Sequence, residues 1–207
     1  MSDSLEQVAE EIRVCARCPL SQSRTVAVPG EGPANADIMF IGEGPGFHED
    51  QSGRPFVGAA GNFLTEMLHE IGLERSDVFI TNIVKCRPPG NRDPQPEEIG
   101  ACSAYLERQI ELINPKVIVT LGRYSMARWF PSARISRIHG QARQVGSRLI
   151  VAMFHPAAAL HQPSLQETVR TDFRKLPGFV QQAQQGAPSA SQDAEDDINR
   201  FEQLSLF

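Results

Sequence analysis

The segment DIMFIGEGPG, residues 37–46, joins an apolar run to a glycine-rich loop. A short apolar run that ends at glycine is typical of a buried strand. Three further runs of this kind follow, at 78–84, 117–121 and 149–154. Apolar spacing predicts helices over 4–14, 62–71, 96–113, 124–129 and 166–180. The chain is therefore predicted to be an α/β protein with three α/β/α layers around a central four-stranded parallel sheet.

Polar side chains follow the predicted strands. Glu43 comes directly after the first strand, Asn82 lies close to the end of the second, and His155 follows the fourth. Ligands of parallel sheets bind beyond the carboxyl ends of the strands. We therefore expect a carboxylate, an amide and an imidazole to face one pocket, where Gly42 and Gly44 expose backbone.

Other interpretations exist for each residue of this pocket. Glu43 can cap a helix or pair with an arginine, Asn82 can satisfy a turn, and His155 can be a structural hydrogen-bonding group. Their position at one sheet edge favours a site instead. The loop at 42–46 is also loosely similar to a dinucleotide-binding loop. That interpretation is disfavoured because position 47 is Phe instead of the third glycine, Pro45 interrupts the loop, and no helix is predicted to begin there.

The chain has four cysteines, Cys15, Cys18, Cys86 and Cys102. No apolar leader or membrane-length run is present, so a reducing, cytoplasmic location is expected. There, a Cys-x-x-Cys pair with two distant cysteines indicates a metal or cluster site rather than four unrelated buried thiols. Structural zinc sites usually have two close pairs, whereas iron–sulfur clusters tolerate wide spacing. The spacing favours a cluster and leaves zinc as an alternative.

Charge is distributed unevenly along the chain. The formal net charge is −5, yet residues 112–166 contain seven basic residues and no acidic one. This segment favours either a surface that faces a polyanion or a set of solvated arginines. Apolar content fits one globular domain over residues 1–180. Residues 181–207 carry five acids and one base and few apolar side chains, so they are predicted to form a disordered acidic tail.

Over roughly residues 5–180 the chain resembles the iron–sulfur uracil-DNA glycosylases, family 4 of that superfamily. The matching motifs are GEGPG at 42–46 with Glu49-Asp50, GRPFVGAAG at 53–61, Thr81-Asn82 and HPAA at 155–158. The four cysteines match the family's cluster ligands in order and spacing. The resemblance implies a uracil-DNA glycosylase-like fold, a [4Fe-4S] cluster, and monofunctional excision of uracil from single- or double-stranded DNA in base excision repair.

The resemblance also implies roles for the pocket residues. Phe56 would stack on the flipped-out base. Asn82 would select uracil by accepting a hydrogen bond from N3–H and donating one to O4. His155 would donate to O2, where negative charge develops as the glycosidic bond breaks. Glu43 and the backbone of Gly44 would hold the attacking water and favour the sugar cation.

Several further residues are candidates for contact with DNA. The cluster is expected to brace the loop at 87–92, from which Arg87 reaches phosphate. Leu160 is a candidate wedge in the duplex. Arg137 and His139 lie in an Arg-Ile-His segment, and a related branch uses such a histidine to trap uracil-DNA covalently. Here the segment follows the third strand, and no insert precedes Cys86, so we predict ordinary turnover, with His139 near phosphate.

The chain ends in QLSLF, residues 203–207. This ending resembles the short peptide by which bacterial replication and repair proteins dock on the sliding clamp. Gln203 would fill a small polar site, and Leu204, Leu206 and Phe207 would supply the apolar contacts. A terminus with chance leucines is the alternative. The protein itself is expected to be a monomer.

Two other functions compete with uracil excision. One is a glycosylase for a different deaminated base, and Asn82 with Phe56 argues for uracil instead. The other is an iron–sulfur DNA-binding protein without catalysis. The intact set of Glu43, Asn82 and His155 argues against that function.

Overall fold

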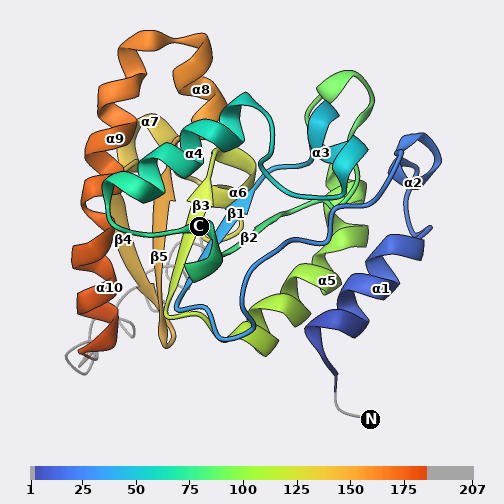
Figure 1. Ribbon diagram of the computed structural model, residues 1–207, viewed down its shortest axis with the longest axis horizontal. Coiled ribbons are helices and arrows are strands. Elements are labelled where there is room, and N and C mark those ends of the chain that lie inside the picture. The colour runs from blue at the N-terminus through green and yellow to red at the C-terminus, as the bar shows by residue number, and fades with distance from the viewer. Residues whose placement is uncertain (1–2, 186–207) are drawn as a thin grey trace, which may run out of the picture.

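A five-stranded sheet lies between two layers of helices in the computed structural model, which describes residues 3–185 (Figure 1). The strands follow the order β2-β1-β3-β5-β4 across the sheet. Their bounds are Ile38–Gly42 for β1, Phe79–Asn82 for β2, Val117–Leu121 for β3, Gln141–Val145 for β4 and Arg148–Met153 for β5. β1, β2, β3 and β5 are parallel, which confirms the α/β class and the four predicted strands.

The prediction of four strands is one strand short. β4 pairs antiparallel with β5 at the edge of the sheet, and four of its five residues are exposed. Its sequence, QARQV, contains no apolar run because an edge strand need not bury both faces. The apolar pattern by which the other strands were found is therefore missing.

The parallel strands bury both faces, as their continuous apolar runs require. In β1, Ile38 and Phe40 contribute to the core beneath α4 (Ala59–Glu70), α9 (Gln166–Arg174) and α10 (Leu176–Gln184). Met39 and Ile41 contribute to the opposite core, beneath α1 (Leu5–Val14) and α5 (Pro96–Ile113). Figure 1 shows these two groups of helices on either side of the strands.

The predicted helix over 166–180 is two helices, α9 and α10, which meet at Lys175. Pro177 at the start of α10 cannot donate a backbone hydrogen bond to the preceding turn. α10 continues to Gln184, a few residues past the predicted domain boundary. The candidate clamp-binding residues Gln203, Leu204, Leu206 and Phe207, like most of the predicted tail, lie outside the described residues.

A short helix, α3 (Phe47–Ser52), begins directly after the glycine-rich loop, so the prediction that no helix begins there was wrong. Glu49 makes the start possible, because its Oε2 accepts a hydrogen bond from the Gly46 N–H at 3.1 Å. A Glu three residues after the N-cap residue, here Gly46, is typical of the start of a helix.

The remaining helical segments are short. They are α2 (Leu20–Ser23), α6 (Arg123–Ala127), α7 (Ile135–Ile138), α8 (Pro156–His161) and the 3₁₀ turns η1 (Arg75–Asp77), η2 (Pro89–Asn91) and η3 (Pro163–Leu165). Within residues 3–185, no helix has both the length and the apolar content needed to cross a bilayer.

The topology creates a crevice at one end of the sheet. The chain leaves β1 toward β2 on one side, and then crosses over β1 to reach β3 on the other side. Ligands of open α/β sheets bind at such a switch point, beyond the carboxyl ends of the strands. Glu43, directly after β1, stands at this position.

Candidate active site

A cavity of about 520 Å³ lies at the carboxyl ends of β1, β2 and β5. This volume falls within the ~300–1,000 Å³ usual for small-ligand pockets and suits one nucleotide rather than a duplex. The cavity is lined by Glu43, Gly44, Pro45, Gly46, Glu49, Phe56, Ala60, Asn82, Pro88, Asn91, Arg92, Asp93, Pro94, His155, Ala157 and His161. The fold thus brings together five residues that the sequence placed in one site: Glu43, Gly44, Phe56, Asn82 and His155.

Gly42 lies behind this cavity and permits two of its side chains to approach β1. A Cβ at Gly42 would lie 2.6 Å from Cζ of Phe56 and would clash with Oδ1 of Asn82. Any larger residue would therefore displace both side chains. The absence of a side chain at Gly42 lets Asn82 and Phe56 pack directly against the backbone of β1.

Asn82 lines the cavity and carries an unpaired acceptor, Oδ1, that lies against Gly42. The residue is buried, and its Oδ1 is buried without a hydrogen-bond partner among residues 3–185. Leaving a buried acceptor unpaired costs roughly 1–3 kcal/mol. A ligand N–H that reached this atom would remove that cost.

Lys85 anchors the end of β2 from behind. Its fully buried ammonium donates to Thr81 Oγ1 at 2.6 Å, to the Asn82 carbonyl oxygen at 2.7 Å and to Gln109 Oε1 at 2.7 Å. Burial lowers the pKa of Lys85 to about 8. No lysine is among the described residues that line the cavity, so Lys85 fixes the backbone of Asn82 without reaching a ligand.

His155 is a neutral hydrogen-bond donor. The Ala157 N–H donates to His155 Nδ1 at 3.1 Å, which leaves the ring proton on Nε2. Shielding from water lowers the pKa of His155 to about 4, although the charge of Glu49 acts in the opposite direction. The imidazole also stacks on Phe56, with ring centroids 5.5 Å apart and planes 25° apart. Near neutral pH it can therefore donate one hydrogen bond from Nε2.

Glu43 is a half-buried carboxyl at the switch point. Burial raises its pKa, opposed by a hydrogen bond from the Tyr124 N–H at 3.3 Å and by the charge of Arg123. Arg123 forms an ion pair with Asp93, which also lines the cavity. A carboxyl with a raised pKa is well suited to hold a water molecule through its oxygens.

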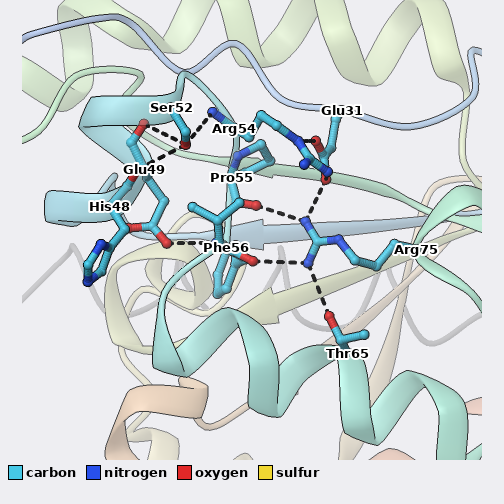
Figure 2. A network of polar contacts seen from close by, with 10 residues as sticks. Glu31, His48, Glu49, Ser52, Arg54, Pro55, Phe56, Thr65 and Arg75 are labelled. Carbon is cyan, nitrogen blue, oxygen red and sulfur yellow. Dashed lines mark hydrogen bonds and ion pairs between the residues drawn. The ribbon is translucent and has the colours of Figure 1, made fainter.

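Glu49 is the site residue whose role the sequence did not indicate. Its Oε1 accepts hydrogen bonds from the N–H groups of Val57 and Gly58, at 2.8 and 2.9 Å, while Oε2 binds the Gly46 N–H. Figure 2 shows this carboxylate beside the loop that carries Phe56. Glu49 thereby joins the glycine-rich loop to the second motif. Its spacing from Gly46 was the signal that could have identified it.

The four cysteines line a second, small cavity between α1, α5 and the end of β2, together with Arg24, Lys85 and Tyr105. Burial raises the pKa of the Cys86 and Cys102 thiols, and the nearby Arg24 and Lys85 oppose this change. Arg24 Nη1 donates to Cys86 Sγ at 3.1 Å. Two cations beside four thiols offset part of the charge that ligand thiolates would carry.

This donor set fits an iron–sulfur cluster. Within the described part of the chain, no three Cys, His, Asp or Glu side chains are arranged to hold a metal ion. A single zinc draws its four sulfurs to about 2.3 Å from one point. In a [4Fe-4S] cluster, the four thiolates bind different iron atoms and stay farther apart. Four thiols around one cavity are the donor set that such a cluster takes.

The candidate DNA contacts lie on the outside of the domain. Arg87 donates from Nε to Asn91 Oδ1 at 2.7 Å, and its guanidinium stands 5.2 Å from the ring centre of Phe47. Phe47 is 53% exposed, which is unusual for phenylalanine. Leu160 is on α8 and 39% exposed, and Arg137 is exposed on α7.

His139 and several basic residues have protein partners. His139 Nδ1 lies 2.6 Å from Oδ2 of the buried Asp172, whose Oδ1 accepts from Lys175 at 2.9 Å. This pairing turns His139 toward α9 instead of leaving it free for phosphate. In the arginine-rich segment, Arg128 and Lys116 pair with acids from outside it. Part of the positive charge is therefore neutralised within the fold.

Comparison with known proteins agrees with this geometry. The sequence model of the Uracil DNA glycosylase superfamily matches residues 29–176. The chain therefore belongs to this superfamily. It is 53% identical over 184 residues to a type-4 uracil-DNA glycosylase of Sulfurisphaera tokodaii, with 84% of each chain covered. The type-4 enzymes of Archaeoglobus fulgidus and Thermotoga maritima are 48% and 44% identical, covering 84% and 85% of this chain and 92% and 94% of their own. These similarities place the chain in the type-4 branch.

Proposed function

We propose that Glu43, Phe56, Asn82 and His155 together excise uracil from DNA. The chain is a uracil-DNA glycosylase that acts in DNA repair, as its similarity to several type-4 enzymes supports. The observation that carries the assignment of residues is the unpaired Oδ1 of Asn82 beside the stacked rings of Phe56 and His155. An amide and an aromatic face in one cavity suit a flipped-out base.

Base selection follows from the amide. Asn82 Oδ1 accepts from uracil N3–H, and the Asn82 amide nitrogen donates to O4. Cytosine presents an acceptor at N3 and a donor at the 4-position, so both contacts become repulsive. A buried polar site discriminates strongly because mismatched groups remain unpaired. Stacking on Phe56 adds affinity for any flat base without choosing among them.

Bond cleavage follows from the histidine and the carboxyl group. When the bond between C1′ and N1 breaks, its electron pair leaves with uracil, and negative charge develops at O2. The neutral Nε2–H of His155 donates to that oxygen without a prior change of protonation. Glu43 and the backbone of Gly44 hold the water that adds to C1′. The water proton passes to Glu43 or solvent, uracil is released, and an abasic site remains.

The test of this function uses an oligonucleotide with one uracil, followed by alkaline cleavage of abasic sites. Cleavage at the uracil, absent from a thymine control, is expected. A denaturing gel should show free product and no protein–DNA adduct, because His139 of the Arg-Ile-His segment pairs with Asp172. Cleavage only with hypoxanthine would favour a glycosylase for another deaminated base. Binding without cleavage of any substrate would favour a non-catalytic role.

We also propose that Cys15, Cys18, Cys86 and Cys102 hold a [4Fe-4S] cluster, with zinc as the alternative. Its role is structural. Cys86 directly precedes the loop at 87–94, whose residues Pro88, Asn91 and Arg92 line the substrate cavity. Asn82 lies four residues before Cys86 on the same segment. A cluster would therefore fix both the base-selecting residue and one wall of the cavity.

Replacing Cys86 with serine is expected to abolish the cluster, lower the unfolding temperature by about 10 °C and reduce excision. Iron and sulfide analysis with thermal unfolding measures the effect. Ser21→Ala is the matched control, because Ser21 lines the same cavity without being a proposed ligand. Wild-type protein that contains one zinc and no iron would refute the cluster.

DNA contact is proposed for the surface around the cavity mouth. Phe47 and Arg87 offer an exposed ring and a cation next to cavity-lining residues, which suits a base and phosphate of the same strand. Leu160, on α8 between the cavity-lining residues Ala157 and His161, is the proposed wedge. We keep Arg137 as a phosphate contact, while the pairing of His139 with Asp172 gives no support to such a role for that residue.

The sliding clamp is a proposed partner through Gln203, Leu204, Leu206 and Phe207, which lie outside the described residues. Deletion of residues 203–207 is expected to abolish binding to the clamp in a surface-binding assay, because both the polar and the apolar contacts are lost. Excision from a short free oligonucleotide should be unchanged. Equal clamp affinity of the full and truncated chains would rule out this partner.

A further inference from the structure

Phe56 has a backbone conformation that is rare for its residue type. Its φ angle is +51°, in the left-handed region that only glycine enters freely. Phe56 also supplies the ring that faces the substrate cavity. Strained backbone at a functional residue persists only when surrounding contacts hold it in place. The contacts around Phe56 identify what holds it.

Arg75 supplies the main restraint. Its guanidinium donates from Nη1 to the Phe56 carbonyl oxygen at 3.1 Å and from Nη2 to the Pro55 carbonyl oxygen at 2.8 Å (Figure 2). A third contact reaches Thr65 Oγ1 at 3.4 Å. Two successive carbonyl groups bound by one rigid, planar cation fix the peptide between them. Arg75 lies on η1 and does not line the cavity.

Glu31 holds this guanidinium in place. Its Oε1 accepts from Arg75 Nη2 at 2.6 Å, while its Oε2 accepts from Arg54 Nε at 2.8 Å. The Arg75 side chain is 20% exposed and the Arg54 side chain 63% exposed. Both arginines therefore pair with the same carboxylate, but of the two only Arg75 donates to the Phe56 and Pro55 carbonyl groups.

Two further features restrain the loop around Phe56. On the C-terminal side, Glu49 binds the Val57 and Gly58 N–H groups. The first turn of α4 packs against the Phe56 carbonyl group so closely that a Cβ at Gly61 would clash with the carbonyl oxygen. The peptide after Phe56 is thus enclosed by Arg75, Glu49 and Gly61, which hold the Phe56 backbone at its positive φ.

We propose that Arg75 is a positioning residue that sets the Phe56 ring for stacking on the excised base. This inference rests on the proposed function of the cavity. Without the guanidinium, the carbonyls of Pro55 and Phe56 lose their donor, and the Phe56 backbone relaxes toward negative φ. The ring then leaves the position opposite His155, and base affinity falls although no cavity-lining residue has changed.

The test compares Arg75→Ala with Arg54→Ala, since both remove one ion pair to Glu31. Excision under single-turnover conditions and inhibition by free uracil are measured for each. The Arg75 variant is expected to bind uracil about 5- to 150-fold more weakly, the loss of one base–aromatic stack. The Arg54 variant is expected to stay within about twofold of wild type. Added guanidinium chloride at millimolar concentration should partly restore the Arg75 variant and leave the Arg54 variant unchanged.

Further variants keep the test decisive. Arg75→Lys keeps the charge beside Glu31 but cannot bridge both carbonyls, so it covers the case in which the alanine variant does not fold. It is expected to lose uracil affinity while unfolding near the wild-type temperature. Phe56→Ala provides the reference for a lost stack. Equal effects of the Arg75 and Arg54 changes, or folded Arg75 variants with wild-type uracil inhibition, would overturn the proposal. Absence of excision by wild-type protein would instead refute the proposed function on which it rests.

Discussion

Replacing Asn82 with aspartate is expected to lower the kcat/KM of uracil excision by about 10⁴-fold. Aspartate has nearly the same shape, but both of its oxygens are acceptors. The donor to uracil O4 is lost, and a negative oxygen faces the lone pairs of O4 instead. The cost is large because Asn82 is buried, and mismatched polar groups at a buried site stay unpaired. Single-turnover excision on a uracil oligonucleotide, with cytosine as competitor base, measures both the rate and the selectivity.

Asn114→Asp is the matched control for this change. Asn114 is the C-cap residue of α5 and does not line the cavity. Its Oδ1 accepts a hydrogen bond from Arg148 Nη2. The same chemical change there is expected to leave excision within about twofold of wild type. An Asn82 variant that retains more than a tenth of wild-type activity would mean that another group selects the base.

Replacing His155 with glutamine is expected to lower the single-turnover rate by about 10²- to 10³-fold, the usual effect of losing one donor to a developing anion. Glutamine is an amide donor, but it cannot keep both the stack on Phe56 and the bond from the Ala157 N–H. His161→Gln is the control, because His161 lines the same cavity from the end of α8. If both variants lose activity equally, the cavity needs imidazole rings in general and not a donor at His155.

The same variant also tests the protonation of His155. Because its pKa is lowered to about 4, the unfolded chain binds more protons than the folded chain between about pH 6.5 and pH 4. The contribution of His155 to stability is therefore complete above pH 6.5 and is lost as the pH falls to 4. We expect the free energy of unfolding of wild type, relative to His155→Gln, to fall by on the order of 2 kcal/mol over this range. Denaturant titrations at several pH values measure this free energy. A difference between wild type and variant that does not change with pH would show that folding does not lower the pKa of His155.

Much of the fold was predictable because burial leaves a simple pattern. The strands at 37–42 and 117–121 are apolar on both faces, and the helix at 96–113 has Pro at its start and apolar spacing throughout. β4 leaves no such pattern, since three of its four exposed residues are polar. The helix after Gly46 was missed because it is short and is stabilised by one cap from Glu49 rather than by an apolar face.

The candidate site divides in a similar way. Residues directly after strands, such as Glu43 and His155, could be grouped because parallel strands end at one edge. Arg75 could not, because its function depends on carbonyl groups 19 and 20 positions earlier in the chain. Backbone acceptors occur at every residue and leave no signal in a sequence. A contact of this kind becomes visible only when the loop and η1 are seen side by side (Figure 2).

Both margins of the sheet are protected against strand addition by a second chain. At one margin, β4 presents a polar, charged strand in place of the apolar β5. At the other margin, Glu31 exchanges backbone hydrogen bonds with Ile80 of β2, at 3.0 and 2.8 Å, and covers that edge locally. Copies of the enzyme that gather on one stretch of damaged DNA can therefore stay separate, without the aggregation that bare apolar edges promote.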